Sequence, residues 1–287
     1  MTYEHRFIPT NGITLHTVVA GPEDGPAVIL LHGYPEFWYG WRRQIPALAA
    51  AGFRVYAPDQ RGYNLSDKPR DLAAYSLDEL ARDILGLIDA TGQARVFLTG
   101  HDWGAMVAWW IALTAPDRLR RLAILNVPHP HVMRRHLMSD PRQMTRSLYA
   151  AFFQLPWLPE LATSALDHRM LANTIRSSSL PGAFRDEEMD EYRRAWSRPG
   201  AMTTMLNWYR AALRRTAAEW PDPRVTVPTT IIWGMKDFAL RAVMAEESAA
   251  LCDRGELIQL EENTHWVQHE AAAVVNEALI TRFASAA

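Results

Sequence analysis

The chain has 287 residues, of which 48% are hydrophobic and 22% are charged, and these are the proportions of an ordinary globular protein. They exclude a disordered chain, and the formal net charge of −2 gives no reason to expect a nucleic-acid partner. The single cysteine, Cys252, excludes an internal disulfide and a cysteine-built zinc site. No apolar run approaches the roughly 18 residues of a membrane span, and the first residues do not resemble a signal peptide, so we expect a soluble cytoplasmic protein.

Short β-branched runs alternate with longer helical patterns over residues 1–128, which is typical of parallel strands joined by crossover helices. A helix is expected to begin after Ser76, because Ser76 and Glu79 have the spacing of a capping box, and to extend to Ile88. Residues 103–114 are apolar on nearly every side of a helix, which indicates a buried helix. The strands expected in this part cover residues 14–20, 28–31, 54–57, 96–99 and 122–125.

The pattern changes at residue 129, because strand patterns disappear and helical periods dominate from there to about residue 227. Strands are expected again at 229–233 and 256–260, and a last helix at 267–283. We therefore predict an α/β fold with a mostly parallel sheet flanked by helices and an all-helical lid inserted into it. The predicted parts are a core of residues 1–128 and 228–287 and a lid of residues 129–227.

Two histidines mark the point where the chain enters the predicted lid. His129 and His131 are separated by Pro130, and no third ligand is near them in the sequence. A metal site needs three or four convergent ligands, so we expect no metal here and interpret the pair as the hinge between core and lid.

The strongest local signal lies directly after the strand predicted at residues 96–99. There the sequence reads GHDWG over residues 100–104, followed at once by the buried helix. A strand, a tight turn with flanking glycines and a helix are the setting of a nucleophile elbow, in which one side chain is raised above the edge of the sheet. The raised residue here is Asp102. The alternative is that Asp102 only caps the helix beginning at Trp103.

An aspartate at this position restricts the chemistry. Its carboxyl group has an ordinary pKa of about 3.9, so it is an anion at neutral pH and needs no base to act as a nucleophile. Attack on an ester or amide would give a mixed anhydride, with little advantage over direct hydrolysis. Attack on a saturated carbon with a leaving group would give an alkyl ester that water can cleave. We therefore expect the electrophile to be an epoxide or an alkyl halide.

Two later loops supply an acid and a histidine. The sequence GMKD at residues 234–237 and the sequence THW at residues 264–266 each follow a predicted strand. Nucleophile, acid and histidine in this order along the chain, each on a loop after a strand, are the arrangement of the α/β-hydrolase fold. We interpret His265 as the base that activates water, and Asp237 as the carboxylate that orients His265 and stabilises its positive charge.

A further loop, HGYPEFW at residues 32–38, follows the strand predicted at 28–31. The oxyanion hole of this fold uses the N–H of the residue after the nucleophile, here Trp103, and one N–H from this loop. We assign the second N–H to Phe37. The alternative is that the loop is only a Gly-Pro turn. The side chains that we expect to line the substrate pocket are His32, Pro35 and Trp38.

These motifs resemble the epoxide hydrolases of the α/β-hydrolase fold, including bacterial enzymes and the hydrolase domain of mammalian soluble epoxide hydrolase. The likeness covers nearly the whole chain and is weakest in the lid. It implies hydrolysis of an epoxide to a vicinal diol, with no metal or cofactor. The motifs that carry it are HGYPE at residues 32–36, QIPAL at 44–48, RGY at 61–63 and GHDWGA at 100–105.

The resemblance also implies two lid tyrosines that bind the epoxide oxygen and supply a proton as the ring opens. One lies in a Trp-Tyr-Arg motif, which is matched by NWYR at residues 207–210 and identifies Tyr209. The other precedes a Phe-Gln pair, a place that Tyr149 fits within residues 149–154. An epoxide leaves as an alkoxide and needs a proton donor, which a tyrosine hydroxyl can be.

Two other classes remain open. Haloalkane and haloacetate dehalogenases share the nucleophile, acid and histidine. Haloalkane dehalogenases commonly place a halide-binding Asn after His-Gly, where this chain has Tyr34, and haloacetate dehalogenases carry arginines where it has Trp103 and Met106. The other class is a non-catalytic small-molecule receptor, which would not need donor, nucleophile, base and acid together.

The sequence therefore predicts a two-stage hydrolysis of lipophilic epoxides by a monomer or a homodimer. Asp102 opens the ring to form a hydroxyalkyl ester while Tyr149 and Tyr209 polarise the epoxide oxygen, and water activated by His265 then cleaves the ester. The methionine-rich lid favours an adaptable apolar pocket, so we expect lipophilic substrates rather than sugars or phosphates.

Overall fold

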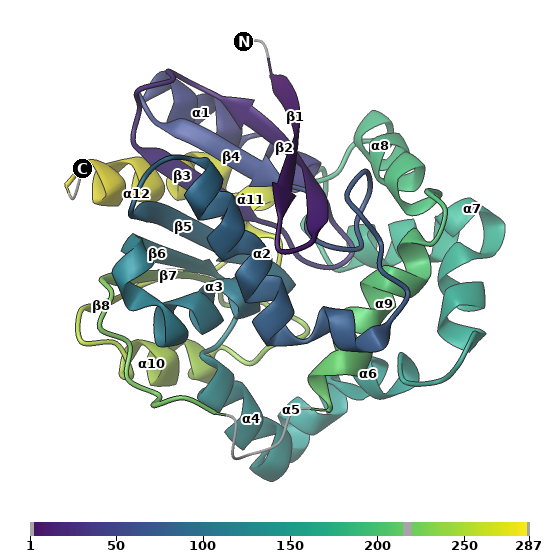
Figure 1. Cartoon of the computed structure of the whole chain (residues 1–287). Coiled ribbons are helices and arrows are strands. Elements are labelled where there is room, and N and C mark those ends of the chain that lie inside the picture. The colour runs from purple at the N-terminus through teal and green to yellow at the C-terminus, as the bar shows by residue number, and fades with distance from the viewer. Residues whose placement is uncertain (1–2, 215–219, 286–287) are drawn as a thin grey trace.

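Apolar strands from both core segments form one central sheet in the computed structural model, which describes residues 3–214 and 220–285 (Figure 1). The strands are β1 (Glu4–Thr10), β2 (Ile13–Ala20), β3 (Ala27–Leu31), β4 (Arg54–Pro58), β5 (Val96–His101), β6 (Leu119–Leu125), β7 (Thr229–Gly234) and β8 (Gly255–Leu260). Their order across the sheet is β1-β2-β4-β3-β5-β6-β7-β8. β1 and β2, and β2 and β4, pair antiparallel, and all other pairs are parallel. The predicted mostly parallel sheet is confirmed.

One strand, β1, was not expected from the sequence. It is an edge strand that pairs only with β2, and most of its side chains are exposed. An edge strand with one solvent-facing side tolerates polar residues and a proline, and Pro9 lies within it. The usual β-branched pattern is therefore missing.

Helices cover both faces of the sheet (Figure 1). On one face, apolar residues of α1 (Gln44–Ala50), α11 (Val267–Glu270) and α12 (Ala272–Ala284) pack against the strands. On the other face, α2 (Leu77–Ala90), α3 (Trp103–Thr114) and α10 (Val243–Ala249) do the same. Helix α3 lies where residues 103–114 were predicted to be buried, and α2 begins at the predicted cap, where the Ser76 hydroxyl accepts the N–H of Glu79. The last helix is divided at Ala271, whereas one unbroken helix was predicted.

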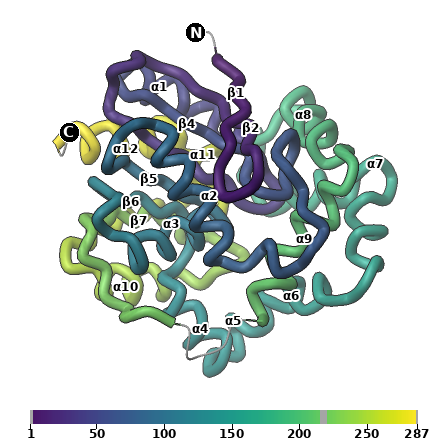
Figure 2. The backbone as a smooth tube through the Cα atoms, in the orientation of Figure 1, coloured from purple at the N-terminus to yellow at the C-terminus, as the bar shows by residue number. Residues whose placement is uncertain are grey.

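The chain leaves the core after β6 and returns at β7, as the tube in Figure 2 shows. The helices between these strands are α4 (Pro130–Ser139), α5 (Pro141–Arg146), α6 (Leu148–Phe152), α7 (Leu158–Ser177), α8 (Asp186–Trp196) and α9 (Ala201–Ala212). Among the described residues of this segment, only Val225 makes a strand-type contact, a single bridge to Cys252. The predicted helical lid is confirmed, while its boundaries at residues 129 and 227 stay predictions.

At the entrance to the lid, His129 and His131 serve the backbone. The His129 ring accepts the N–H of His131, and the His131 ring bonds the carbonyl of Pro221.

In the described part of the chain, no helix is both long enough and apolar enough to cross a membrane.

Candidate active site

Asp102 occupies a strained turn between β5 and α3. Its backbone has φ 49° and ψ −126°, a conformation that residues other than glycine rarely adopt. The flanking glycines make the turn possible, because a Cβ on Gly100 would lie 2.5 Å from Ala105 Cα and one on Gly104 would lie 2.2 Å from the Leu31 carbonyl oxygen. The Asp102 carboxylate is not used as a helix cap. Its Oδ1 accepts the backbone N–H of Tyr34, with 2.6 Å between nitrogen and oxygen.

His265 and Asp237 stand beside Asp102 on the loops after β8 and β7. His265 Nδ1 lies 2.7 Å from Asp237 Oδ2, and His265 Nε2 lies 3.7 Å from Asp102 Oδ2. The side chains of His265 and Asp237 are buried. The carboxyl ends of parallel strands meet at one edge of a sheet, which is why three residues far apart in the sequence meet here. The arrangement leaves Nε2 of His265 facing the carboxylate of Asp102.

Asp237 is held in place by groups that sequence reasoning did not identify. Its Oδ1 accepts the backbone N–H groups of Ala239 and Leu240 at 2.8 and 2.9 Å. Its Oδ2 accepts from Asn126 Nδ2 at 2.8 Å, and Asn126 follows β6. The sequence did contain a signal for Asn126, because this residue directly follows the strand predicted at residues 122–125, at the edge of the sheet that carries Asp102.

The electrostatics of the three residues are coupled. Burial alone would lower the pKa of His265, but the carboxylates of Asp237 and Asp102 outweigh it and raise the pKa to about 10. Burial alone would raise the pKa of Asp102, but the hydrogen bond and charge of His265 lower it below its ordinary value. At neutral pH, Asp102 is therefore an anion beside a protonated His265.

This coupling makes part of the fold's stability depend on pH. The folded-state pKa of His265 lies at about 10, above its ordinary value of about 6.5, so the stabilisation is complete below about pH 6.5 and is lost as the pH rises toward 10. We expect the unfolding temperature of the wild type to fall from pH 7 to pH 10 more steeply than that of His265→Gln. Calorimetry of both proteins measures this, and equal slopes would contradict the assigned pKa.

Tyr149 of α6 and Tyr209 of α9 face each other, with ring centroids 5.9 Å apart. Burial is the main cause that raises the pKa of each hydroxyl, and the negative charge of Asp102 adds to it. Both hydroxyls are therefore neutral donors at physiological pH. The Tyr209 ring also meets the rings of Trp103 and Tyr34 edge-on, at 5.0 and 5.4 Å.

The segment after α6 is tied to α9, and this brings the two tyrosines together. Gln154 Nε2 donates to the carbonyl of Tyr209 at 3.2 Å, and Arg210 Nε donates to the carbonyl of Phe153 at 2.9 Å. Arg210 also forms a bidentate ion pair with Glu160, with Nη1–Oε1 and Nη2–Oε2 distances of 2.7 and 3.0 Å. The Gln of the Phe-Gln pair and the Arg of the Trp-Tyr-Arg motif thus position the tyrosines.

A cavity of about 300 Å³ lies between the core and the lid, at the lower end of the usual size range for small-molecule sites. Asp102, His265, Tyr149 and Tyr209 open onto it. Most of its other wall residues are apolar or aromatic: Tyr34, Pro35, Phe152, Phe153, Ala162, Met170, Leu171, Ile175, Phe238, Ala239, Leu240 and Trp266. Asp102, His265 and both tyrosines therefore share one mostly apolar cavity.

Comparison with known proteins agrees with this geometry. The family model of the alpha/beta hydrolase fold matches residues 26–272. Epoxide hydrolase 4 of Homo sapiens is 36% identical over 281 residues, which cover 96% of this chain and 76% of that protein. This chain belongs to the epoxide hydrolase family of the α/β-hydrolase fold.

Other relatives extend this result. The AB hydrolase superfamily protein YfhM of Bacillus subtilis is 48% identical over 275 residues, and the match covers 96% of each chain. Among solved structures, an epoxide hydrolase from metagenomes of hot environments has a TM-score of 0.86 at 35% identity, covering 97% of this chain and 98% of the other. The Bacillus megaterium epoxide hydrolase in complex with an inhibitor has a TM-score of 0.88 at 28% identity, covering 96% and 99%.

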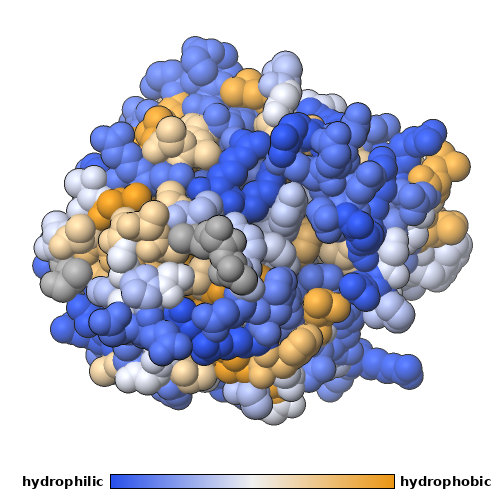
Figure 3. Space-filling view, turned by 90° about the horizontal axis from the view of Figure 1, so that it is seen from above, coloured by the Kyte–Doolittle hydropathy of each residue, from blue (hydrophilic) through white to orange (hydrophobic). Residues whose placement is uncertain are grey.

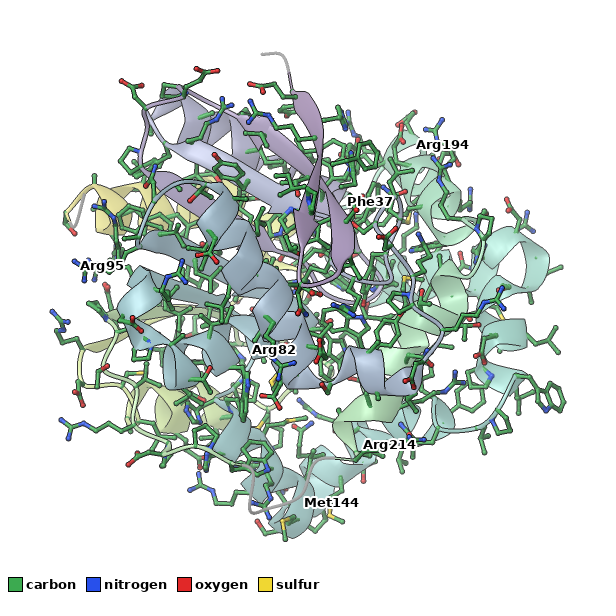
Figure 4. All side chains as sticks on the ribbon, in the orientation of Figure 1. Phe37, Arg82, Arg95, Met144, Arg194 and Arg214 are labelled. Carbon is green, nitrogen blue, oxygen red and sulfur yellow. The ribbon has the colours of Figure 1, made fainter. Side chains whose placement is uncertain are left out.

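In this epoxide hydrolase family member, the second backbone donor at the nucleophile differs from the one expected. The N–H of Tyr34 donates to Asp102, in the place where the N–H of Phe37 was expected, and the N–H of Trp103 helps to lower the pKa of the carboxylate. Phe37 lies beyond the turn of the loop, where its ring meets Tyr192 of α8 edge-on at 5.4 Å (Figure 4). A Cβ on Gly33 would lie 2.2 Å from Asp102 Oδ1, so this glycine brings the next N–H against the carboxylate.

Two of the three expected pocket residues are not among the cavity walls. Pro35 lines the cavity as expected. His32 is fully buried, and its Nε2 accepts the N–H of Gln60 at 3.0 Å, so its ring supports the backbone. Trp38 meets the rings of Tyr3 and His5 near the N-terminal strands. The expectation was wrong for Trp38 because the loop turns away from the cavity after Pro35, and wrong for His32 because its ring points to the backbone of Gln60.

Beneath the cavity, the same loop fastens the lid to the core of the epoxide hydrolase. Glu36 is buried and accepts from Tyr192 of α8 at 2.6 Å and from the His269 ring at 2.7 Å. Trp196 of α8 donates to the carbonyl of Pro35 at 2.6 Å. Burial alone would raise the pKa of Glu36, but the neighbouring histidines hold it well below its ordinary value. The carboxylate therefore stays charged and joins α8 to α11, the short helix that follows His265.

Proposed function

We propose that this enzyme hydrolyses lipophilic epoxides to vicinal diols through a covalent ester on Asp102. The observation that carries the proposal is the placement of a carboxylate nucleophile and two tyrosine hydroxyls on one apolar cavity. An epoxide needs both attack at carbon and a proton donor for its oxygen. Relatives that are epoxide hydrolases by name support the same chemistry.

In the first step, an Asp102 carboxylate oxygen attacks a ring carbon from the side opposite the carbon–oxygen bond that breaks. Tyr149 and Tyr209 hold the epoxide oxygen, and one of them gives it a proton as the ring opens. The products of this step are a hydroxyalkyl ester on Asp102 and a tyrosinate. Protonated His265 then returns a proton to the tyrosinate and becomes neutral.

Ester formation prepares His265 for the second step. The Asp102 carboxylate is one of the two charges that raise the pKa of His265, and an ester has no charge. The pKa of His265 therefore falls, and the neutral ring can take a proton from water. The hydroxide formed attacks the Asp102 carbonyl carbon, and the N–H groups of Tyr34 and Trp103 bind the oxyanion; the bond from Tyr34 N–H to Asp102 supports this role for Tyr34. When the intermediate collapses, the proton of its hydroxyl group passes to the departing alcohol oxygen, which releases the diol and restores the Asp102 carboxylate beside a protonated His265.

The cavity walls define the substrate class that we propose. None of the described residues that line the cavity is an arginine or a lysine, and most are apolar. A charged substituent buried there would lack a counter-charge, so aryl or alkyl epoxides fit best. Turnover restricted to charged epoxides would contradict this assignment. A cytoplasmic location, a monomeric or dimeric state and the lack of a cofactor stay predictions.

A single turnover in H2(18)O tests the ester mechanism. With enzyme in excess over an aryl epoxide, water attacks Asp102 and not the substrate, so we expect unlabelled diol and one heavy oxygen in the Asp102 carboxylate. Mass spectrometry of the diol and of the peptide containing Asp102 measures both.

Three other results would overturn the proposal. Labelled diol in the first turnover would show direct attack of water on the epoxide. Bromoalkane and fluoroacetate assays with halide detection are run in parallel, and halide release without diol would identify a dehalogenase. Failure to turn over any compound of a broad panel, despite binding, would favour a receptor.

The tyrosines are expected to act together. Because either hydroxyl can still donate, Tyr149→Phe and Tyr209→Phe should each lower kcat/KM by about 10- to 100-fold, and the double variant by about 1,000-fold or more. Tyr39→Phe is the matched control, since Tyr39 is partly buried and does not line the cavity. Steady-state kinetics with an aryl epoxide measure the effect, and a double variant with wild-type activity would exclude both residues as donors.

A further inference from the structure

One side of the lid presents large apolar side chains to solvent. The exposed fractions of Leu148, Trp157, Leu161 and Leu166 lie between 60% and 74%. They belong to α6, to α7 and to the turn between these helices. In Figure 3, hydrophobic residues gather at the right-hand edge of the molecule, where α7 lies in Figure 1. We call these four residues the lid apolar surface.

The segment that carries the lid apolar surface has almost no charge. Residues 147–166 contain one charged side chain, Glu160, and its charge is paired with Arg210 of α9. Exposed apolar patches of this kind usually mark a place where another protein or a lipid surface binds.

Exposed arginines flank the lid apolar surface in the sequence. Arg142 and Arg169 are exposed and lie before and after the uncharged segment. Arg214, labelled in Figure 4, is exposed and lies two residues after the end of α9. The acidic neighbours are Asp167, which is exposed, Glu160, which is paired with Arg210, and Asp140, which is paired with Arg241 and His136. An apolar centre with a basic border is complementary to a lipid surface that carries anionic headgroups.

The cavity reaches the surface in the same region. Phe152, Met170 and Phe238 line the cavity and are also 36% to 55% exposed, so the cavity opens between α6, α7 and the loop after β7. Phe152 and Met170 are near neighbours of the lid apolar surface in sequence and extend it to the opening. A molecule that left a lipid layer at this place would enter the cavity without crossing water.

We propose that the lid apolar surface binds the headgroup region of an anionic lipid layer, with the cavity opening turned toward the lipid. A second copy of this chain is a less suitable partner for the lid apolar surface. A symmetric pair would bring two basic borders together and would cover the opening of both cavities. The binding itself is independent of the proposed function. Only the uptake of a lipophilic epoxide from the lipid rests on that function.

Vesicle flotation tests the binding. The full chain is mixed with vesicles of phosphatidylcholine and phosphatidylglycerol at 7:3, and with pure phosphatidylcholine vesicles. We expect flotation with the anionic vesicles, and about tenfold weaker partition with the neutral ones or at high salt. The triple variant Trp157→Asn, Leu161→Gln, Leu166→Asn should lower the partition by about 100-fold. Asparagine is chosen where φ is positive, at Trp157 and Leu166.

A matched control removes three exposed apolar side chains from other faces. Phe7→Gln, Val243→Gln and Val274→Gln change residues of β1, α10 and α12 that are 41% to 60% exposed. This control should float like the wild type. The residues of the test variant do not belong to the described cavity walls, so its unfolding temperature and its kcat/KM for a water-soluble epoxide should be unchanged.

Several outcomes would overturn the proposal. One is that the wild type does not float, and another is that the test variant floats like the wild type. Light scattering adds a third: a wild-type dimer that the test variant converts to a monomer would show that the surface is an interface between copies. Loss of epoxide turnover with retained flotation would instead contradict only the proposed function. Faster turnover of a vesicle-dissolved epoxide by the wild type than by the test variant would support uptake from lipid.

Discussion

Replacement of Asp102 by asparagine is expected to lower kcat/KM for an aryl epoxide by about 10,000-fold or more, because the anionic nucleophile is lost. Asparagine has nearly the same shape and tolerates the positive φ of the turn, so the fold should remain. Steady-state kinetics and intact-protein mass spectrometry after incubation with epoxide measure the loss of turnover and of the ester.

A carboxylate-to-amide change elsewhere is the control for Asp102→Asn. Asp71 caps a short helical turn by accepting the N–H of Ala73, and asparagine caps equally well, so Asp71→Asn should keep wild-type activity. Diol formation by Asp102→Asn at more than a few per cent of the wild-type rate would show that water opens the epoxide directly. The ester mechanism would then be wrong.

Replacement of His265 by glutamine is expected to separate the two chemical steps. Ring opening needs only Asp102 and the tyrosines, while ester hydrolysis needs a base, so hydrolysis should slow by about 1,000-fold or more. The protein should gain the mass of one epoxide, with the added mass on the peptide that contains Asp102. Diol release should stop after less than one equivalent.

The pH of the His265→Gln experiment matters. Burial raises the pKa of Asp102 and His265 opposes this, so the pKa of Asp102 should rise when His265 is removed. At pH 8 the carboxylate should still be ionised, and the ester should form. If no ester accumulates at pH 8 although Asp102 is intact, His265 is needed for ring opening as well. That result would contradict the assignment of separate roles.

The catalytic centre could be predicted from the sequence because each of its parts has a local signal. The flanking glycines of GHDWG mark the turn at Asp102, and Asp237 and His265 each follow an apolar strand. The edge of a parallel sheet then brings them together without any knowledge of the loops. The positions of Tyr149 and Tyr209 depended on the family resemblance, because aromatic residues in a helical lid have no distinct pattern of their own.

The backbone donor could not be predicted in the same way. Any N–H in the loop after β3 could have faced Asp102, and the loop conformation decides which one does. The absence of a Cβ at Gly33 lets the loop approach the carboxylate, so Tyr34 is the donor and Phe37 is not. Trp38 and His32 were misplaced for the same reason, since the direction of each side chain depends on how the loop turns.

The bonds between α8 and the loop of Pro35 and Glu36 have a consequence for how substrate range can change over evolution. Substitutions in α8 disturb a buried charge beside the catalytic loops, so selection should tolerate few of them. In α6 and α7, cavity-wall and solvent-facing residues other than Tyr149 and Glu160, such as Phe152 and Met170, touch no such charge. New substrate preferences can therefore arise at these positions while α8 keeps the loop of Pro35 and Glu36 in place.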